Sequence, residues 1–329
     1  METKKTIRNN ATNEEYEGLP WLDSPCLVKS ECSKAKSNPM KLRKVRRGNF
    51  KSMKIKSTPL MLKSKIGTVK RYDISQFYKL DHKLGIGTYG EVWLATNKQT
   101  DQKVAIKIAK GSTSIKLLKN ETIILKQFSC EFFPRFIEFE EDEMYKRAYL
   151  VMEYLDGHTL DQILSNSDTL STPKSAEIIS SLAKAVKVLH DKGICHRDIK
   201  PQNIIITKTG AMKLIDFNIS KSYIKEDKVY SSKFYSKFFT QISSPLFAAP
   251  EIKSLDWYNE SIDIWGIGVA YFCMRLGLEK FQNFDTKSWY DIYIQESELN
   301  DWEKFIISSC LSTDPETRPS IYELVEKLA

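Results

Sequence analysis

The most informative segment of the chain reads ICHRDIKPQN, residues 194–203, and a second short segment, LIDF, follows at residues 214–217. The first segment places Asp198 and Asn203 five positions apart on a predicted loop, and the second contributes Asp216. Transfer of a phosphoryl group requires metal ligands on the transferred group, a carboxylate that orients the attacking hydroxyl, and a cation on the phosphates. The two segments therefore supply carboxylate and carboxamide oxygens of the kinds that this chemistry uses.

A glycine-rich segment lies upstream and reads LGIGTYGEV, residues 84–92. Glycines at this spacing let the backbone N–H groups of a β-hairpin approach a polyphosphate closely. The same pattern opens a helix in dinucleotide-binding folds, but here β-prone residues follow it. A second predicted strand, KVAIK at residues 103–107, ends in Lys107, from which a cation can reach the phosphates. Judged from this segment alone, Lys107 is explained about as well as a surface lysine at the end of an edge strand.

In this order, the glycine-rich segment, Lys107 and the two downstream segments resemble the eukaryotic protein kinase family. The resemblance extends from about Phe77 to the end of the chain. It implies an α+β architecture, the bilobal protein kinase fold, with a small β-rich N-lobe that carries helix αC and a larger, mainly helical C-lobe. We expect the N-lobe at about residues 75–153 and the C-lobe at about 158–329, with a hinge near 153–157.

The resemblance also assigns catalytic roles. Asp198 matches the carboxylate that accepts the proton of the substrate hydroxyl, and Lys200 matches a lysine that Ser/Thr-specific relatives place near the γ-phosphate. Lys107 matches the lysine of the third strand. Its partner on αC is expected to be Glu121, because ETIILK at residues 121–126 is similar to the family's αC pattern and no other acidic residue lies between Lys107 and Glu121.

Two further sets of residues match the family's sites for Mg²⁺ and ATP. Asn203 and Asp216 match the side chains that hold magnesium on the phosphates. ATP is expected to contact Leu84, Gly85, Gly87, Gly90, Val92, Ala105, Lys107, Met152, Glu153, Leu155 and Ile205. Met152 matches the gatekeeper position, and the backbone of Glu153 and Leu155 is expected to face the adenine. The apolar members of the set are also compatible with an ordinary core role, since core strands line this pocket in the family.

Three matches are expected to be structural. Glu251, in the APE triplet at residues 249–251, is expected to pair with Arg318. Asp263, at the start of an apolar helical segment, is expected to hold the backbone of the catalytic loop.

One departure concerns Asn218, which stands where the family's DFG triplet has glycine. Asparagine tolerates positive φ better than most residues, so we expect the active geometry to be kept. The alternative is a nucleotide-binding pseudokinase scaffold, whose output would be protein contacts and not turnover.

The segment from Asp216 to Glu251 is rich in hydroxyl side chains, and the resemblance implies regulation there. We expect an upstream kinase to phosphorylate a residue within 230–240, with Arg197 receiving the phosphate. The expected partners are protein substrates with Ser/Thr acceptors. Ala248 and Gln202 support neither a proline-directed nor a strongly basophilic preference.

The basic charge is concentrated at the N-terminus. The 329-residue chain has a formal net charge of +8, and residues 1–70 hold 17 Lys and Arg against 6 Asp and Glu. Low apolar content and repeated prolines predict that residues 1–74 form a disordered extension before the kinase domain at 75–329. Its cluster at residues 41–47 is typical of segments that bind an importin or another anionic partner, although a solvated tail explains it as well.

The remaining composition bounds the compartment. No run approaches the roughly 20 apolar residues of a transmembrane helix, and no apolar signal segment follows Met1. The six cysteines form no C-x-x-C pair and are expected to be free thiols in a reducing compartment. We expect a cytoplasmic protein, with the nucleus as the alternative.

Overall fold

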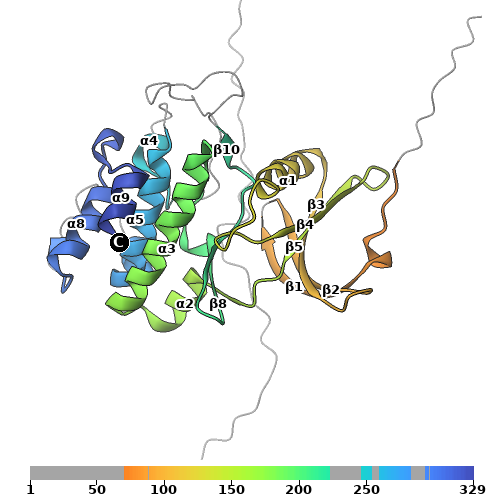
Figure 1. Ribbon diagram of the computed structural model, residues 1–329, viewed down its shortest axis with the longest axis horizontal. Coiled ribbons are helices and arrows are strands. Elements are labelled where there is room, and N and C mark those ends of the chain that lie inside the picture. Colours follow the sequence, from red (N-terminus) through yellow and green to blue (C-terminus); the bar gives the residue numbers. More distant parts are fainter. Residues whose placement is uncertain (1–69, 88, 223–245, 254–258, 283–292, 296) are drawn as a thin grey trace, which may run out of the picture. The chain divides into compact units, whose positions relative to one another are not determined.

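The structure is a computed structural model that describes residues 70–87, 89–222, 246–253, 259–282, 293–295 and 297–329. These residues form a bilobal kinase fold, with a sheet-rich lobe and a helical lobe (Figure 1). The predicted fold class is therefore confirmed. Residues 1–69, which include most of the expected N-terminal extension, lie outside the described part of the chain.

The N-lobe is built on a five-stranded antiparallel sheet with the order β1-β2-β3-β5-β4. A 3-10 turn at Ile74–Gln76 leads into it. The strands are β1 (Tyr78–Gly87), β2 (Gly90–Asn97), β3 (Lys103–Lys110), β4 (Phe136–Asp142) and β5 (Arg147–Glu153). Strand β3 is central and its six middle residues are buried, which explains its nearly continuous apolar sequence.

The turn between β1 and β2 depends on Gly90. This residue has φ of 152°, and a Cβ atom there would lie 2.3 Å from the carbonyl oxygen of Ile108 on β3. Only glycine allows so close a backbone approach at such a φ. The third glycine of the motif therefore has a packing reason that does not depend on any ligand.

Helix α1 (Ser112–Leu125) is the main helix of the N-lobe and packs on the sheet. Ile115, Leu118 and Leu125 are buried in this interface, and Glu121 lies on the same buried side of the helix. The interface places the acidic side chain of Glu121 at the inner edge of the lobe, toward β3.

The C-lobe is organised around α5 (Ser261–Leu276), a helix that is buried on nearly all sides. Its neighbours are α3 (Thr172–Asp191), α8 (Asp301–Cys310) and α6 (Leu278–Gln282), and α9 (Ile321–Lys327) packs on α3. Gly266 lets α5 approach the catalytic loop, because a Cβ there would lie 2.6 Å from Cβ of Ile199. The central helix thus supports the loop that carries Asp198.

Short elements complete the C-lobe. A three-stranded sheet has the order β6-β8-β9, and β10 pairs with β7. The elements not yet given are β6 (Gly157–Thr159), α2 (Leu160–Ser167), β7 (Ile194–Cys195), a 3-10 turn (Pro201–Asn203), β8 (Ile204–Thr207), β9 (Met212–Leu214), β10 (Lys221–Ser222), α4 (Pro250–Lys253) and a 3-10 turn (Pro315–Thr317).

Two expectations from composition can be compared with this fold. In the described part of the chain, no helix has the length and apolar character needed to cross a bilayer. The cysteines at positions 130, 195, 273 and 310 are free, and Cys26 and Cys32 lie outside the described residues.

Candidate active site

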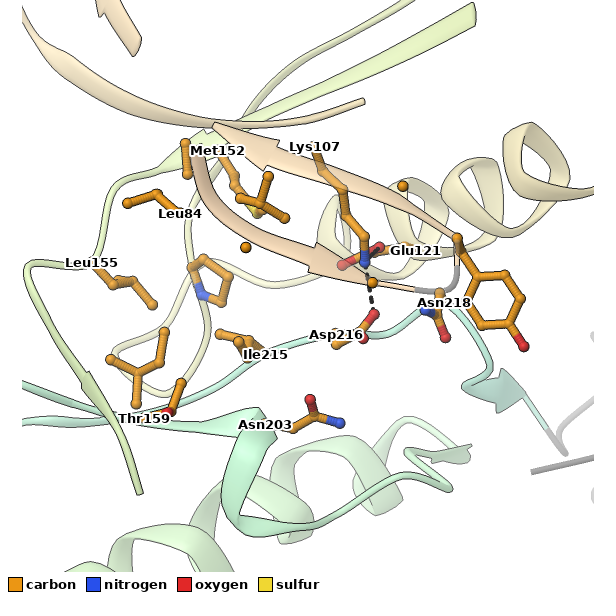
Figure 2. Close-up of a pocket in the computed structure, with 18 of the residues that line it drawn as sticks. Leu84, Lys107, Glu121, Met152, Leu155, Thr159, Asn203, Ile215, Asp216 and Asn218 are labelled. Atoms are coloured by element: carbon orange, nitrogen blue, oxygen red, sulfur yellow. Dashed lines mark hydrogen bonds and ion pairs between the residues drawn. The ribbon is translucent and has the colours of Figure 1, made fainter. Parts of the chain in front are cut away.

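A cavity of about 400 Å³ is lined by residues of both lobes. Figure 2 shows side chains from the strands of the N-lobe and from the loops of the C-lobe converging on it. Every residue that the sequence assigned to catalysis, nucleotide binding or metal binding lines this cavity. Positions as distant in sequence as Leu84 and Asp216 are therefore brought together in one place.

The cavity also contains residues that the sequence reasoning missed. They are Tyr89, Pro134, Tyr154, Thr159 and Ile215; Asn218, which the sequence marked as a departure from the motif, also lines the cavity. Ile215 directly precedes Asp216, so its proximity to the site could have been inferred from the motif. Pro134 comes from the loop between α1 and β4, and no local pattern in the sequence marks it.

Lys107 connects two carboxylates at the inner end of the cavity. Its Nζ lies 2.7 Å from Oε2 of Glu121 and 2.7 Å from Oδ1 of Asp216, so the expected ion pair with Glu121 is present. Burial opposes the charged form of Lys107, but the carboxylates of Asp216 and Glu121 outweigh it and raise the pKa of the ammonium group. Burial also opposes ionisation of Asp216, and Lys107 outweighs it and holds the pKa of that carboxyl below its ordinary value.

The catalytic loop arranges two polar side chains around Asp198, those of Lys200 and Asn203. Oδ2 of Asp198 accepts hydrogen bonds from Nζ of Lys200 at 2.7 Å and from Nδ2 of Asn203 at 2.9 Å. The same Nδ2 of Asn203 donates to the backbone carbonyl of Asp198 at 2.8 Å, which fixes the amide orientation. The amide oxygen of Asn203 is thus directed away from Asp198.

Asp263 of α5 holds the backbone of the catalytic loop. Its carboxylate accepts hydrogen bonds from the backbone N–H groups of His196 and Arg197, both at 2.8 Å, as expected from the sequence. Nε2 of His190 lies 2.9 Å from the same carboxylate. Arg197 adopts φ of 73°, a strained conformation for a non-glycine residue, and these bonds help to stabilise it.

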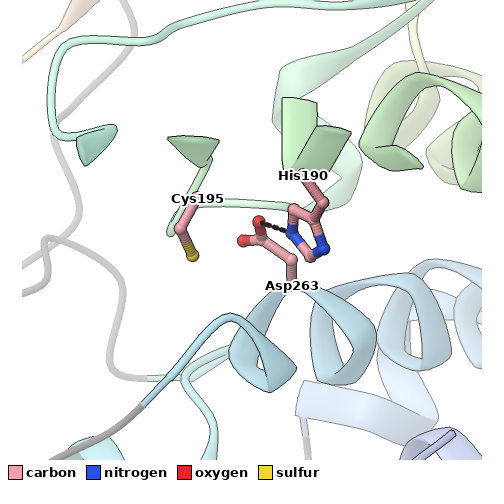
Figure 3. Close-up of side chains that lie close together, drawn as sticks. All are labelled: His190, Cys195 and Asp263. Atoms are coloured by element: carbon pink, nitrogen blue, oxygen red, sulfur yellow. Dashed lines mark hydrogen bonds and ion pairs between the residues drawn. The ribbon is translucent and has the colours of Figure 1, made fainter. Parts of the chain in front are cut away.

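His190, Cys195 and Asp263 lie close together in this anchor (Figure 3). Their ligand atoms lie within 4.8 Å of one another, a spacing that metal sites also show. However, both oxygens of Asp263 already accept hydrogen bonds. Burial, reinforced by Asp263, raises the pKa of the Cys195 thiol well above its ordinary value, which disfavours the thiolate that a metal would need. We therefore interpret the cluster as structural.

The conformation around Asn218 differs from the expectation. Asn218 does not have a positive φ, whereas Asp216 has φ of 70°. The tolerance of asparagine for positive φ is therefore not what accommodates the replaced glycine. Phe217 is fully buried, with its ring 5.3 Å from that of Phe133 and 5.0 Å from that of His196. This packing holds Phe217, the residue directly after Asp216, in the core.

A second buried ion pair lies in the C-lobe. NH1 and NH2 of Arg318 bind the two carboxylate oxygens of Glu251 at 2.6 and 2.8 Å, so this expected pair is present. NH1 also donates to the carbonyl of Ser261 at 3.2 Å, at the first residue of α5. The pair thus attaches α4 to the central helix.

The charged and polar side chains of the site fit a nucleoside triphosphate with a divalent cation. The oxygens of Asn203 and Asp216 are ligands of the kind that Mg²⁺ prefers, and Lys107 and Lys200 bring positive charge for phosphates. The hydroxyl-rich stretch expected to be phosphorylated, within 230–240, lies outside the described residues.

Comparisons with known proteins agree with this geometry. A family model described as the protein kinase domain matches residues 78–328. The chain is 30% identical to CBL-interacting serine/threonine-protein kinase 8 of Arabidopsis thaliana, over 75% of this chain and 56% of the relative. It is 28% identical to sporulation-specific protein 1 of Saccharomyces cerevisiae, over 76% and 52%. It is 29% identical to serine/threonine-protein kinase 33 of Mus musculus, over 77% and 54%. The chain thus spans about half the length of these curated relatives.

Proposed function

The chain belongs to the protein kinase family, and from this we propose that it transfers the γ-phosphoryl group of ATP to serine and threonine hydroxyls of protein substrates. Membership in the family implies the use of ATP and a divalent metal ion in general. The observation that carries the proposal is the convergence of the Lys107, Glu121 and Asp216 ion pairs and the Asp198 loop on one cavity.

The residues around the cavity divide the reaction between them. Lys107, held by Glu121, binds and orients phosphate oxygens, and Asp216 and Asn203 would hold magnesium, which neutralises charge on the phosphates. Asp198 accepts the proton of the attacking hydroxyl at its carboxylate. Lys200, which already donates to Asp198, offers a positive charge near the transferred group.

The preference for serine and threonine rests on Lys200 and on the names of the relatives, which include serine/threonine-protein kinases. Regulation by an upstream kinase acting within 230–240 is part of the proposal, with Arg197 as the expected phosphate contact. Binding of an importin or another anionic partner by residues 41–47, and a cytoplasmic or nuclear location, remain predictions from the sequence.

Phosphate incorporation into a generic protein substrate tests the proposal. The wild type is expected to phosphorylate Ser/Thr in the presence of ATP and magnesium, and Asp198→Asn to reduce the rate by about 10²- to 10⁴-fold, the usual contribution of a general base. Asp191→Asn is the matched control, because Asp191 lies on α3 and pairs with Lys187 on the surface.

The same assay distinguishes a pseudokinase scaffold. A wild type that binds ATP but incorporates no phosphate contradicts the proposed enzyme. If Asn218→Gly then restores turnover, the replacement of glycine by Asn218 is what disables an otherwise complete site.

A further inference from the structure

Asn120 makes an unusual set of contacts for a helical asparagine. It immediately precedes Glu121 on α1, and its Nδ2 lies 2.8 Å from the carbonyl oxygen of Ser220. The same nitrogen lies 3.1 Å from the carbonyl oxygen of Asn218 and 3.3 Å from that of Phe217. Three backbone acceptors from one segment thus converge on a single side-chain nitrogen.

The acceptors determine the orientation of the amide. Nitrogen and oxygen of an asparagine side chain are distinguished by their partners, and all three partners here are carbonyl oxygens, which only accept. The NH₂ group must therefore face them. With two N–H groups for three acceptors, at least one hydrogen is shared between two of the carbonyls.

These contacts form a second link between α1 and the segment that follows Asp216. The first link is ionic and passes through Lys107, which binds both Glu121 and Asp216. The second is neutral and passes through Asn120. Because it acts on residues 217–220, it restrains the chain directly after Asp216.

The second link continues into the C-lobe. The hydroxyl of Ser220 donates to the carbonyl of His196 at 3.0 Å, and the N–H of His196 donates to Asp263. A continuous series of hydrogen bonds therefore runs from α1, through Ser220 and the catalytic loop, to the buried anchor on α5. Residues 217–220, which directly follow Asp216, are thus held between α1 and the catalytic loop.

We propose that Asn120 is a positioning residue for phosphoryl transfer, which holds residues 217–220 against α1 so that Glu121, Lys107 and Asp216 keep their geometry. The inference rests on the proposed function and deepens it. The contact of Asn120 also involves Asn218, the residue that replaces glycine in the motif, because Asn218 is buried and its carbonyl is one of the three acceptors.

The sharpest test is Asn120→Asp, which keeps the shape of the side chain but replaces the NH₂ group by an oxygen. At pH 8 a carboxylate would face the three carbonyls, and kcat is expected to fall about tenfold or more, equivalent to roughly 1.4 kcal/mol. As the pH is lowered, protonation restores one donor. The activity of Asn120→Asp relative to wild type is therefore expected to rise.

Two variants serve as controls. Asn120→Leu has a similar size but no donor at any pH, so its activity relative to wild type is expected to be low and independent of pH. Gln127→Ala removes a side-chain amide that donates to Ile123 at 3.2 Å on the exposed surface beyond α1, and is expected to match wild type. Thermal melting of each variant separates loss of activity from loss of folding.

A second measurement does not depend on turnover. Backbone amide exchange in peptides that cover residues 216–222 is expected to be faster in Asn120→Asp than in wild type and in Gln127→Ala. If the wild type transfers no phosphate but this difference is found, the proposed function fails while the restraint by Asn120 stands. If wild type is active and Asn120→Asp equals it at every pH, or falls to the same pH-independent level as Asn120→Leu, the inference is overturned.

Discussion

Asp216 and Asp263 are both carboxylates with lowered pKa values, but the protein holds them in different ways. Asp216 lies at the cavity with its side chain 29% exposed, and its Oδ1 binds the cation of Lys107. Asp263 is fully buried, and both of its oxygens accept hydrogen bonds from backbone N–H groups or His190. A carboxylate bound at one oxygen and open to a cavity can still bind a ligand, whereas a saturated one can only fix the chain around it.

Burial raises the pKa of both carboxyl groups, and in each case different partners outweigh this effect and lower the pKa. For Asp216, burial raises the pKa and the positive charge of Lys107 more than offsets it. For Asp263, burial raises the pKa, and hydrogen bonds from His190 and the backbone of Arg197 more than offset it. The comparison predicts that loss of Asp216 is felt mainly in activity and loss of Asp263 mainly in stability.

Within the comparison of Asp216 and Asp263, the largest expected effect is that of Asp216→Asn on phosphoryl transfer. The amide keeps the shape but removes a negative charge that faces the cavity, so the rate is expected to fall by about 10²- to 10³-fold, as for other preorganised electrostatic groups. The free energy of unfolding is expected to change by about 1 kcal/mol or less, since the Asp216 side chain is partly exposed and Lys107 keeps its ion pair with Glu121. Phosphate incorporation and urea unfolding check the two parts. A variant that unfolds readily but turns over normally when folded would reverse the assignment.

The next effect is that of Asp263→Asn on stability. Three donors converge on this carboxylate, and an amide cannot accept from all of them, so the free energy of unfolding is expected to fall by about 3 kcal/mol. For a domain of this size the melting temperature would fall by roughly 6–12 °C. Urea unfolding monitored by fluorescence measures it, with Asp191→Asn on the surface as the control. If the free energy of unfolding falls by less than about 1 kcal/mol, the hydrogen bonds that Asp263 accepts do not anchor the catalytic loop as described.

The smallest effect concerns acidification. Because the pKa of Asp263 is lower in the folded than in the unfolded chain, its contribution to stability is present above the unfolded value of about 4 and is lost as the pH falls further. The difference in unfolding free energy between wild type and Asp263→Asn is therefore expected to narrow as the pH falls from 6 to below 4. Parallel urea titrations measure this difference. If the difference in unfolding free energy between wild type and Asp263→Asn stays constant or widens on acidification, the folded protein does not stabilise the ionised form of Asp263.

Much of the site could be predicted because its chemistry is written in short local motifs. Asp198, Lys200 and Asn203 belong to one loop, and Asp216 follows after a brief hairpin. Their order after the glycine-rich segment and Lys107 gave the resemblance to the kinase family that assigned their roles. Glu121 could be chosen as the partner of Lys107 because residues 121–126 resemble the family's αC pattern and no competing acid lies between the two positions. The anchor at Asp263 was also predictable, because DIWGIG at residues 263–268 resembles the start of the family's buried central helix, where the acidic residue holds the catalytic-loop backbone.

Other features could not be predicted because they join segments without a local pattern. Pro134 and Thr159 line the cavity only because a loop after α1 and the start of α2 meet there. Asn120 looks like an ordinary polar residue of a helix until the segment 217–220 is folded against it. The left-handed residue is Asp216 and not Asn218, next to a buried Phe217 and in an ion pair with Lys107, and no local pattern in the sequence indicates this.

The difference between the features that the sequence predicts and those that it does not has a physical reason. Periodicity, glycine spacing and the order of charged residues act within a few positions of the chain, so the lobes, the glycine-rich turn and the identities of the charged groups follow from the amino-acid sequence. Contacts between segments far apart in the chain depend on how buried surfaces fit and on which carbonyls and charges that fit brings within about 3 Å. The position of Asn120, the backbone at Asp216 and the saturation of Asp263 were therefore decided only when the lobes had folded.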